Sequence, residues 1–259
     1  MRLFTLLLAL LAAASYAEEV DVELFLAVDM SQSMSFDELD LQRQGYAAAL
    51  TSPDVLDTIR RGPLGVIAVT YVEWAGVGRM RTIVPWTRLA TAADAAAIAE
   101  EIATNFETTR RGTSMSSVML HVAQSFETNG FQGLRHVLDI SGDGPNNTGP
   151  RVTDARDHLL SRGIVINGLP LMPHGRVWDE WSIPDLDRYY TECVIGGPGA
   201  FVVPVRDWDE FSGALRRKLV LELASNPAPP ERLWTTTAYD CLIGERIWHR
   251  NMRQDFFSQ

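Results

Sequence analysis

The stretch VDVELFLAVDMSQS, residues 20–33, indicates the fold of this chain. Residues 20–28 are mostly apolar and β-branched, which is typical of a buried β-strand. The run ends at Asp29, and Ser31 and Ser33 follow it at every second position. An extended or turning loop can direct such alternate side chains to the same side. The stretch therefore predicts a buried strand that ends in a group of polar side chains.

Strand-like and helix-like patterns alternate along the rest of the chain. Ser35 and Glu38 have the spacing of a capping box and predict the start of a first helix. Residues 65–74 and 79–86 are strand-like and flank a short turn with two glycines, which predicts an antiparallel hairpin. Further strands are expected at residues 134–140, 164–171 and 201–205. Further helices are expected at residues 91–106 and 150–161, from residue 113, from residue 182, and at residues 207–224.

This alternation predicts an α/β fold with three layers, in which helices cover both faces of a doubly wound sheet. We expect six strands, mostly parallel, with one antiparallel strand at the edge. Residues 18–224 would form this domain, since 259 residues of which 46% are hydrophobic can bury one sizeable core. The Asn-Pro-Ala-Pro-Pro segment at residues 226–230 breaks the pattern, so residues 225–259 are expected to be an irregular tail.

The N-terminus predicts a secreted or periplasmic protein. Arg2 is followed by an apolar run over residues 3–13 and then by Ser15-Tyr16-Ala17, which is the pattern of a cleaved signal peptide over residues 1–17. The alternative is an uncleaved anchor, but the run is shorter than the ~20 residues that a membrane-spanning helix needs. No later stretch is typical of a membrane span, so none is expected after cleavage.

The charge argues against a nucleic-acid partner. The formal net charge is -10, and no stripe of basic side chains with interleaved aromatic residues occurs in the sequence. Such a chain would repel phosphate backbones.

The two cysteines, Cys193 and Cys241, allow one disulfide. An oxidising compartment favours that bridge, which would tie the tail to the main domain. The alternative is a pair of separate buried thiols, and the sequence does not decide between them.

Three polar clusters follow or precede the predicted elements. Residues 29–33 end the first strand, residues 112–114 (Gly-Thr-Ser) begin a helix, and residues 141–144 (Ser-Gly-Asp-Gly) end a later strand. Parallel strands end at the same edge of a sheet, and the chain returns to that edge before residue 113. Because ligands bind beyond the carboxyl ends of such strands, the three clusters are expected to form one site.

The residue types of these clusters suit a hard divalent cation. Ser31, Ser33 and Thr113 offer neutral hydroxyl oxygens, and Asp29 and Asp143 offer charge. Oxygen ligands of this kind are preferred by Mg²⁺, with Mn²⁺ or Ca²⁺ as alternatives. The simpler interpretation is that these residues only cap loops and helices, as Ser, Thr and Asp often do.

The order Asp-x-Ser-x-Ser, then Gly-Thr before a helix, then Ser-x-Asp-Gly resembles the metal-ion-dependent adhesion site (MIDAS) of von Willebrand factor A domains. The resemblance covers residues 20–224, and residues 189–190 and 196–201 with the signal peptide resemble a secreted bacterial branch of that family. It implies that the two serines and Thr113 contact the metal directly, and that the two aspartates act through water.

The same resemblance implies a binding protein that is not an enzyme. Without a directly bound carboxylate the cation stays electrophilic and keeps an open position, which an Asp or Glu carboxylate of a partner protein or peptide can fill. We therefore expect a role in adhesion or assembly. The same site could instead make the chain an accessory subunit of a periplasmic enzyme complex.

Side chains around the site are candidates for contacts with that partner. The loop after the fifth strand carries Arg176, Trp178 and Trp181, and Trp74 is expected at the opposite rim. An equally good interpretation is that the tryptophans pack beneath the loop. Arg110 and Arg111 could also attract an acidic partner, although such pairs are more often merely solvated.

Enzyme motifs are absent from the sequence. Residues 112–116 do not complete a Gly-x-Ser-x-Gly motif, there is no His-Glu-x-x-His and no P-loop, and the five histidines are scattered. The best enzymatic alternative is a Mg²⁺-dependent phosphoryl hydrolase with Asp29 and Asp143 beside the metal. Ser31 argues against it, because phosphoaspartate enzymes have a second aspartate at that position.

Overall fold

The computed structural model describes residues 17–105, 111–172, 181–224 and 238–257. Their centre is a five-stranded sheet with the order β3-β2-β1-β4-β5. β1 pairs in parallel with β2 and β4, β4 pairs in parallel with β5, and β2 pairs in antiparallel with the edge strand β3. The strands span β1 Glu18–Asp29, β2 Ile67–Trp74, β3 Met80–Leu89, β4 Phe131–Gly142 and β5 Val165–Pro170. The predicted α/β class, the mostly parallel sheet and the antiparallel edge strand are confirmed.

The prediction of a sixth strand at residues 201–205 is wrong. Val202 and Val205 make only isolated parallel bridges, to Gly168 and Leu171. Val203 N and Val205 N donate hydrogen bonds to carbonyls of β5, both at 3.0 Å. Pro204 lies between them, and because residues 203 and 205 both donate toward β5, the position of its missing N–H faces the outer edge, where no further strand could pair.

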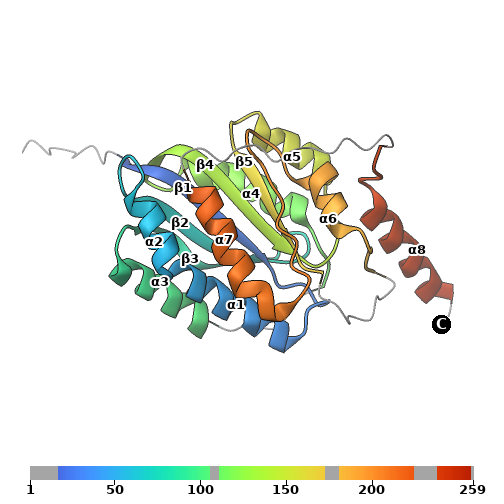
Figure 1. Cartoon of the computed structure of the whole chain (residues 1–259). Helices are drawn as coiled ribbons and strands as arrows, with labels where there is room; N and C mark the ends of the chain where they lie inside the picture. The colour runs from blue at the N-terminus through green and yellow to red at the C-terminus, as the bar shows by residue number, and fades with distance from the viewer. Residues whose placement is uncertain (1–16, 106–110, 173–180, 225–237, 258–259) are drawn as a thin grey trace, which may run out of the picture.

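Helices cover both faces of the sheet (Figure 1). α1, α2, α3 and α7 share one hydrophobic core with the sheet, while α4 and α5 share the other. In β1 the alternation is direct, because Leu24 and Leu26 belong to the first core and Phe25 and Ala27 to the second. The helices span α1 Phe36–Leu50, α2 Pro53–Arg60, α3 Ala92–Thr104, α4 Met115–Glu127, α5 Val152–Leu160, α6 Leu186–Tyr189, α7 Phe211–Leu223 and α8 Ile243–Phe257. The three-layer arrangement is thus confirmed.

The predicted capping box begins α1. Ser35 Oγ accepts a hydrogen bond from Glu38 N at 3.3 Å, and Ser35 N donates to Glu38 Oε2 at 2.8 Å. These two contacts satisfy backbone N–H groups that the first turn of a helix would leave unpaired. They fix the end of the loop that leaves β1, which is the loop with the first polar cluster.

The C-terminal segment contains the long helix α8, so the expectation of an irregular tail is wrong for these residues. Ile247 of this helix is buried and joins the core that α4 and α5 share with the sheet. Tyr239, Cys241 and Ile243 pack against the same core. Figure 1 shows α8, drawn in red, beside the edge of the sheet where β1 and β4 end. The segment after residue 237 therefore packs as part of the domain.

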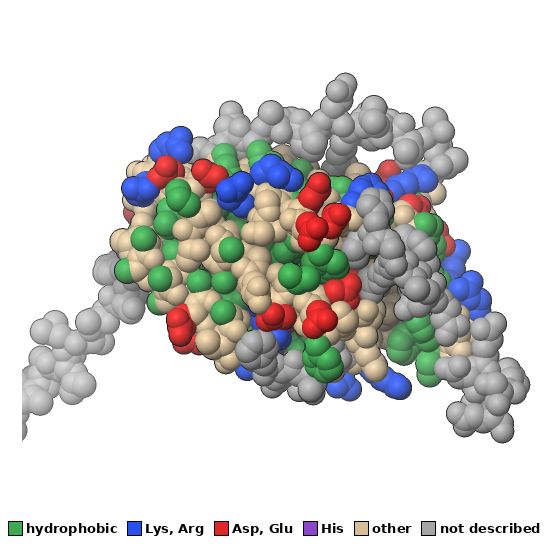
Figure 2. Space-filling model, turned by 60° about the horizontal axis from the view of Figure 1, so that its bottom comes forward, with side chains coloured by type: hydrophobic (Ala, Val, Ile, Leu, Met, Phe, Trp, Pro, Cys, Tyr) green, Lys and Arg blue, Asp and Glu red, His purple; other side chains and the backbone are tan. Residues whose placement is uncertain are grey.

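The surface is mixed in charge. Figure 2 shows one face, on which acidic and basic side chains are interspersed with apolar ones. Phe36 and Leu134 are among the large apolar residues that are mostly exposed. Within the described part of the chain, no helix is both long and apolar enough to cross a membrane. The predicted signal peptide lies outside the described residues, apart from residue 17.

Candidate metal centre

The three polar clusters meet at one cavity. This cavity has a volume of about 410 Å³, and Ser31, Ser33, Thr113 and Asp143 all line it. Asp29 ends β1 two positions before Ser31 and is fully buried. The structure thus brings together all five residues that the sequence predicts to hold a metal.

Hydrogen bonds connect the first and third clusters. Ser31 Oγ lies 3.0 Å from Ser33 Oγ. Ser33 Oγ donates to Asp143 Oδ1 at 2.8 Å. Two loops separated by 110 residues are therefore joined through hydroxyl and carboxylate oxygens.

Asp29 is held rigidly but only half satisfied. Its Oδ1 accepts a hydrogen bond from Ser31 N at 2.7 Å, and Gln42 Nε2 donates to its backbone carbonyl at 3.1 Å. Its Oδ2 is buried and has no hydrogen-bond partner among the residues that the structure describes. A buried carboxylate oxygen without a partner is costly, because it has lost water and gained nothing in return.

The electrostatics of the two aspartates favour a cation beside them. Burial raises the pKa of Asp29 to about 8, and the nearby negative charge of Asp143 contributes to this shift. A positive ion would relieve both effects, since it replaces lost hydration and cancels the repulsion. Among the described residues no group of three or more His, Cys, Asp and Glu side chains could hold a metal. A cation here would therefore need the hydroxyl oxygens as well, and that donor set fits a hard ion such as Mg²⁺.

Close packing of two glycines positions Thr113. Gly112 has a φ of +84°, and a Cβ there would lie 3.3 Å from Gly76 Cα in the turn between β2 and β3. A Cβ on Gly76 would lie 2.5 Å from the carbonyl oxygen of Arg111, so the turn tolerates no side chain there. Ser114 N donates to Ala75 O at 2.9 Å and completes the contact.

Two asparagines outside the predicted clusters connect the loop of the third cluster to Thr113 and to the start of α4. Thr113 N donates to Asn147 Oδ1, and Asn147 N donates back to Thr113 O, both at 2.9 Å. Asn146 Oδ1 accepts hydrogen bonds from the N and Oγ of Ser116, both at 3.1 Å. The sequence carries a signal for these two residues, because both asparagines follow Asp143 within four positions.

The position between Ser141 and Asp143 has no room for a side chain, and Gly142 occupies it. A Cβ at this position would lie 2.8 Å from Asp29 Oδ2 and 3.1 Å from the hydroxyl of Tyr190. Tyr190 in turn donates a hydrogen bond to the carbonyl of Gly142 at 3.4 Å. The glycine thereby lets the ends of β1 and β4 approach closely.

The described residues include two members of the predicted partner-binding rim, Trp74 and Trp181. Trp74 is 0% exposed and belongs to the core beside Phe25, so its assignment to the rim is wrong. Trp181 does line the cavity, and so does the exposed Arg111. Arg176, Trp178 and Arg110 lie outside the described residues.

The C-terminal helix provides a wall of the cavity that the sequence did not predict. Trp248 and Met252 of α8 line it together with the metal-site residues. The rings of Trp248 and Trp181 are in contact, with centroids 5.3 Å apart and planes inclined by 56°. Both tryptophans are half-buried. Nothing in the sequence near residue 248 indicates this position.

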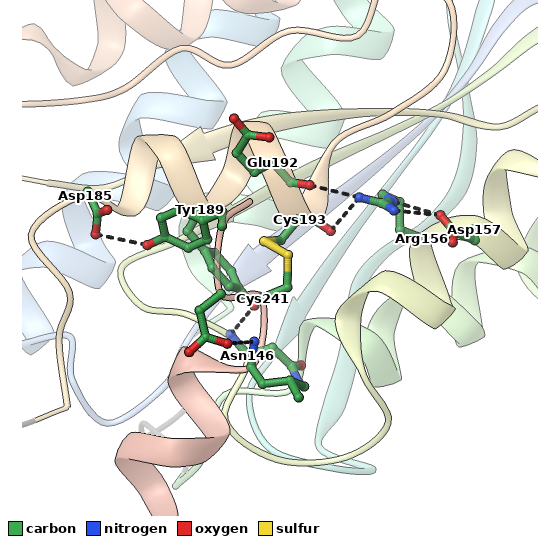
Figure 3. The surroundings of a disulfide bond; sticks show 11 residues. Asn146, Arg156, Asp157, Asp185, Tyr189, Glu192, Cys193 and Cys241 are labelled. Atoms are coloured by element: carbon green, nitrogen blue, oxygen red, sulfur yellow. Dashed lines mark hydrogen bonds and ion pairs between the residues drawn. A yellow bond between two sulfur atoms is a disulfide. The ribbon is translucent and has the colours of Figure 1, made fainter. Parts of the chain in front are cut away.

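A disulfide between Cys193 and Cys241 holds the segment that leads into α8 (Figure 3). Cys193 lies in a π-helical turn, Tyr190–Val194, that follows α6. Arg156 of α5 donates to the carbonyls of Glu192 and Cys193, at 3.0 and 3.4 Å, and so fixes that turn. The structure thus adopts the pairing that the sequence left open.

Hydrogen bonds add to this covalent link. Tyr239 Oη donates to Asp185 Oδ1 at 3.0 Å, and Asn146 Nδ2 donates to Glu245 Oε1 at 2.7 Å. A Cβ on Gly244 would lie 2.1 Å from the carbonyl oxygen of Asn146, so the start of α8 lies directly on the loop of the metal site.

This sheet order and the site at its edge define a protein with the von Willebrand factor A fold. The solved structures that match include proximal thread matrix protein 1 from the mussel byssus with a zinc-occupied MIDAS motif, at 17% identity and a TM-score of 0.57. They also include the von Willebrand factor type A protein from Catenulispora acidiphila, at 15% identity and a TM-score of 0.55, and BatB from Bacteroides thetaiotaomicron, at 18% and 0.53. Residues 19–227 match the family described as "Protein of unknown function (DUF1194)", and the chain belongs to this family.

The likeness to these structures concerns the fold. The match covers 80% of this chain and 48% of the mussel protein, and 79% of this chain and 43% of the Catenulispora protein. The chain thus spans about half the length of either, whereas its match covers 79% of this chain and 100% of BatB. None of the curated proteins matches the sequence.

Proposed function

We propose that this chain is a secreted or periplasmic binding module that attaches to a partner protein through a divalent cation. Ser31, Ser33 and Thr113 would hold the cation directly, and Asp29 and Asp143 would stabilise it through water. The bound ion supplies a positive centre with an open position for an anionic oxygen. The group that it binds is an Asp or Glu carboxylate on a partner protein or peptide.

The observation that carries this proposal is the buried, unpartnered Oδ2 of Asp29 behind a cavity lined by hydroxyl oxygens from separate loops. Residues that only cap loops would satisfy their own oxygens locally. Here instead burial and the nearby charge of Asp143 raise the pKa of Asp29, so its ionised form is destabilised unless a cation lies beside it. A cation is the simplest group that compensates both.

We propose Mg²⁺ as the ion, with Mn²⁺ and Ca²⁺ as alternatives. The donor set consists of hydroxyl and carboxylate oxygens, which such hard ions prefer. The MIDAS motif of the mussel protein holds zinc, so the fold is compatible with a divalent ion.

Binding is favoured over phosphoryl transfer by the residue at position 31. A hydrolase that uses Asp29 as its nucleophile would need a second acid near it to protonate the leaving group. Ser31 occupies that position, and its hydroxyl contacts Ser33. An accessory subunit of a periplasmic enzyme complex would use the same metal chemistry and differ only in its partner.

Calorimetry with Mg²⁺, Mn²⁺ and Ca²⁺ on the oxidised protein tests the metal site. We expect one ion to bind per chain, and Asp29→Ala to abolish that binding. Asp54→Ala is the matched control, because Asp54 is exposed at the start of α2 and should leave metal affinity unchanged. Thermal unfolding establishes that both variants are folded. Unchanged metal affinity in folded Asp29→Ala would refute the assignment.

A pull-down from periplasmic extract tests the second half of the proposal. The immobilised protein is incubated with the extract in Mg²⁺ or in chelator, with Asp29→Ala in parallel. A protein retained only by the wild type and only in Mg²⁺ is the expected result. Retention that is indifferent to chelator would contradict a carboxylate bound through the metal.

A further inference from the structure

The cavity at the metal site has two chemically different sides. One side consists of the hydroxyl and carboxylate groups of the three loops, including Ser31, Thr113 and Asp143. The other side consists of apolar side chains, with Trp248 and Met252 provided by α8 and Trp181 provided by the segment before α6. A site that bound only a carboxylate would have no use for the second side.

The apolar side is built into the structure. The rings of Trp181 and Trp248 support each other at 5.3 Å. Ile247, the neighbour of Trp248, is buried in the core, and the disulfide of Cys241 ties the start of this segment to the π-helical turn. Met252 is 47% exposed and can adjust to a ligand, since its side chain is flexible and polarizable. A fixed aromatic wall with one adaptable residue is suited to recognition of an apolar group.

The charges indicate which kind of molecule would enter. Among the described residues that line the cavity, Arg111 is the one basic side chain, and it is exposed. Together with a cation at the hydroxyl groups, it makes the polar side complementary to an anion. The volume of about 410 Å³ falls within the usual range of about 300–1,000 Å³ for ligand sites.

We propose that Trp181, Trp248 and Met252 form a specificity subsite that receives an aromatic or large aliphatic side chain of the partner, next to the carboxylate bound at the metal. The partner is therefore a peptide segment in which an acidic residue lies within two positions of such a side chain. This inference rests on the proposed function and names the class of sequence that the site selects. Aromatic side chains fit best, because they pack edge-to-face against tryptophan rings.

Selection from a random peptide library displayed on phage tests the subsite. The oxidised full-length protein is immobilised in Mg²⁺, and bound phage are eluted with chelator. The expected result is enrichment of peptides with Asp or Glu beside an aromatic or large aliphatic residue. Enrichment of acidic peptides without an apolar neighbour would overturn the subsite and leave the proposed function intact. Absence of any chelator-eluted peptide would overturn both.

Variants then locate the apolar contact. We expect Trp248→Ala to weaken binding of an enriched peptide by about tenfold or more, as for a buried aromatic anchor. Mg²⁺ affinity, measured with the metal alone, should change by less than about twofold, because Trp248 offers no metal ligand. Met252→Ala should have a smaller effect in the same direction.

The matched control is Trp86→Ala. Trp86 is a partly exposed tryptophan of β3 that packs against Phe126 near the end of α4, and it does not line the cavity. Its removal should leave both peptide and metal affinity unchanged. An equal loss in Trp86→Ala and Trp248→Ala would mean that general destabilisation explains the result, and it would overturn the subsite. Full peptide affinity in Trp248→Ala would do the same.

Discussion

Asn146 and Glu245 join the metal-site loop to the C-terminal helix, since Asn146 Nδ2 donates to Glu245 Oε1 at 2.7 Å. Asn146 also accepts two hydrogen bonds from Ser116 at the start of α4. One asparagine therefore links the helix that begins beside Thr113, the loop that follows Asp143 and the segment that carries Trp248. Changes in any of these elements are expected to affect the others.

The first prediction concerns Glu245. Glu245→Ala should lower the free energy of unfolding by about 1–3 kcal/mol, because the buried Nδ2 of Asn146 keeps its bond to the carbonyl of Pro150 but loses its second acceptor. Metal affinity should fall as well, since the loop of Asp143 loses a support. Urea unfolding and calorimetry with Mg²⁺ measure the two effects. Arg246→Ala is the control: it removes the exposed ion pair between Arg246 of α8 and Asp240, which precedes the helix, and it should change neither quantity by much.

The second prediction concerns the disulfide. Replacement of both Cys193 and Cys241 by serine should lower the free energy of unfolding by about 2–4 kcal/mol, since the bridge closes a long loop. The loop spans 48 residues. The fluorescence of Trp181 and Trp248 should also shift to longer wavelength as their contact loosens. A double variant with unchanged stability and unchanged emission would show that α8 is held in place without the covalent link.

The third prediction uses two glycines that are two positions apart. Gly142→Ala should destabilise the protein by about 1–3 kcal/mol and weaken metal binding, because the new methyl group would press on Asp29 Oδ2. Gly144→Ala is the matched control, since a Cβ there meets nothing within 4 Å. Its effect on stability should stay within about 0.5 kcal/mol. Equal effects of the two substitutions would contradict the close approach of β1 and β4 at this point.

The fourth prediction concerns pH and a buried charge cluster beneath α7. Lys218 lies 2.6 Å from Asp139 Oδ1 and 2.5 Å from Glu222 Oε1, and all three side chains are fully buried. One cation cannot compensate two carboxylates. Burial, together with the charge of Asp139, therefore raises the pKa of Glu222 from 4.5 to about 7.

The sign of the effect follows from proton binding. Between pH 4.5 and about 7 the folded protein holds a proton on Glu222 that the unfolded chain has released. The stabilisation from this group is complete below pH 4.5 and is lost as the pH rises through about 7, so it decreases by an amount of order 1–3 kcal/mol. Glu222→Gln should remove that part of the pH dependence in urea unfolding at pH 5, 6, 7 and 8. A variant that kept the wild-type slope would refute this origin.

The elements of the domain could be predicted from sequence where local pattern and burial agree. The apolar run that ends at Asp29 predicts both the central strand and the site at its end, and Ser35 with Glu38 predicts the start of α1. Each of these signals depends on neighbours in the chain. The five oxygen-bearing residues were predictable for the same reason, since each lies at the end or start of an element.

The errors concern interactions between distant segments. Residues 201–205 have the composition of a strand, but they pair with β5 only through isolated bridges. The position of Trp74 at a strand end favours the rim in the sequence. In the structure β2 lies between β1 and β3, and all eight of its residues are buried. The position of Trp248 depends on the pairing of Cys241 with Cys193, which no local pattern specifies.

The disulfide also determines which preparations of this protein can be informative. Thiols stay reduced in the cytoplasm of an ordinary expression host, so material purified from there would lack the bond that ties the start of the C-terminal segment to the domain. Such material would keep the hydroxyl groups of the three loops but present a loosened aromatic surface. In binding assays it would accept acidic peptides with little discrimination, and export to an oxidising compartment would restore the selectivity.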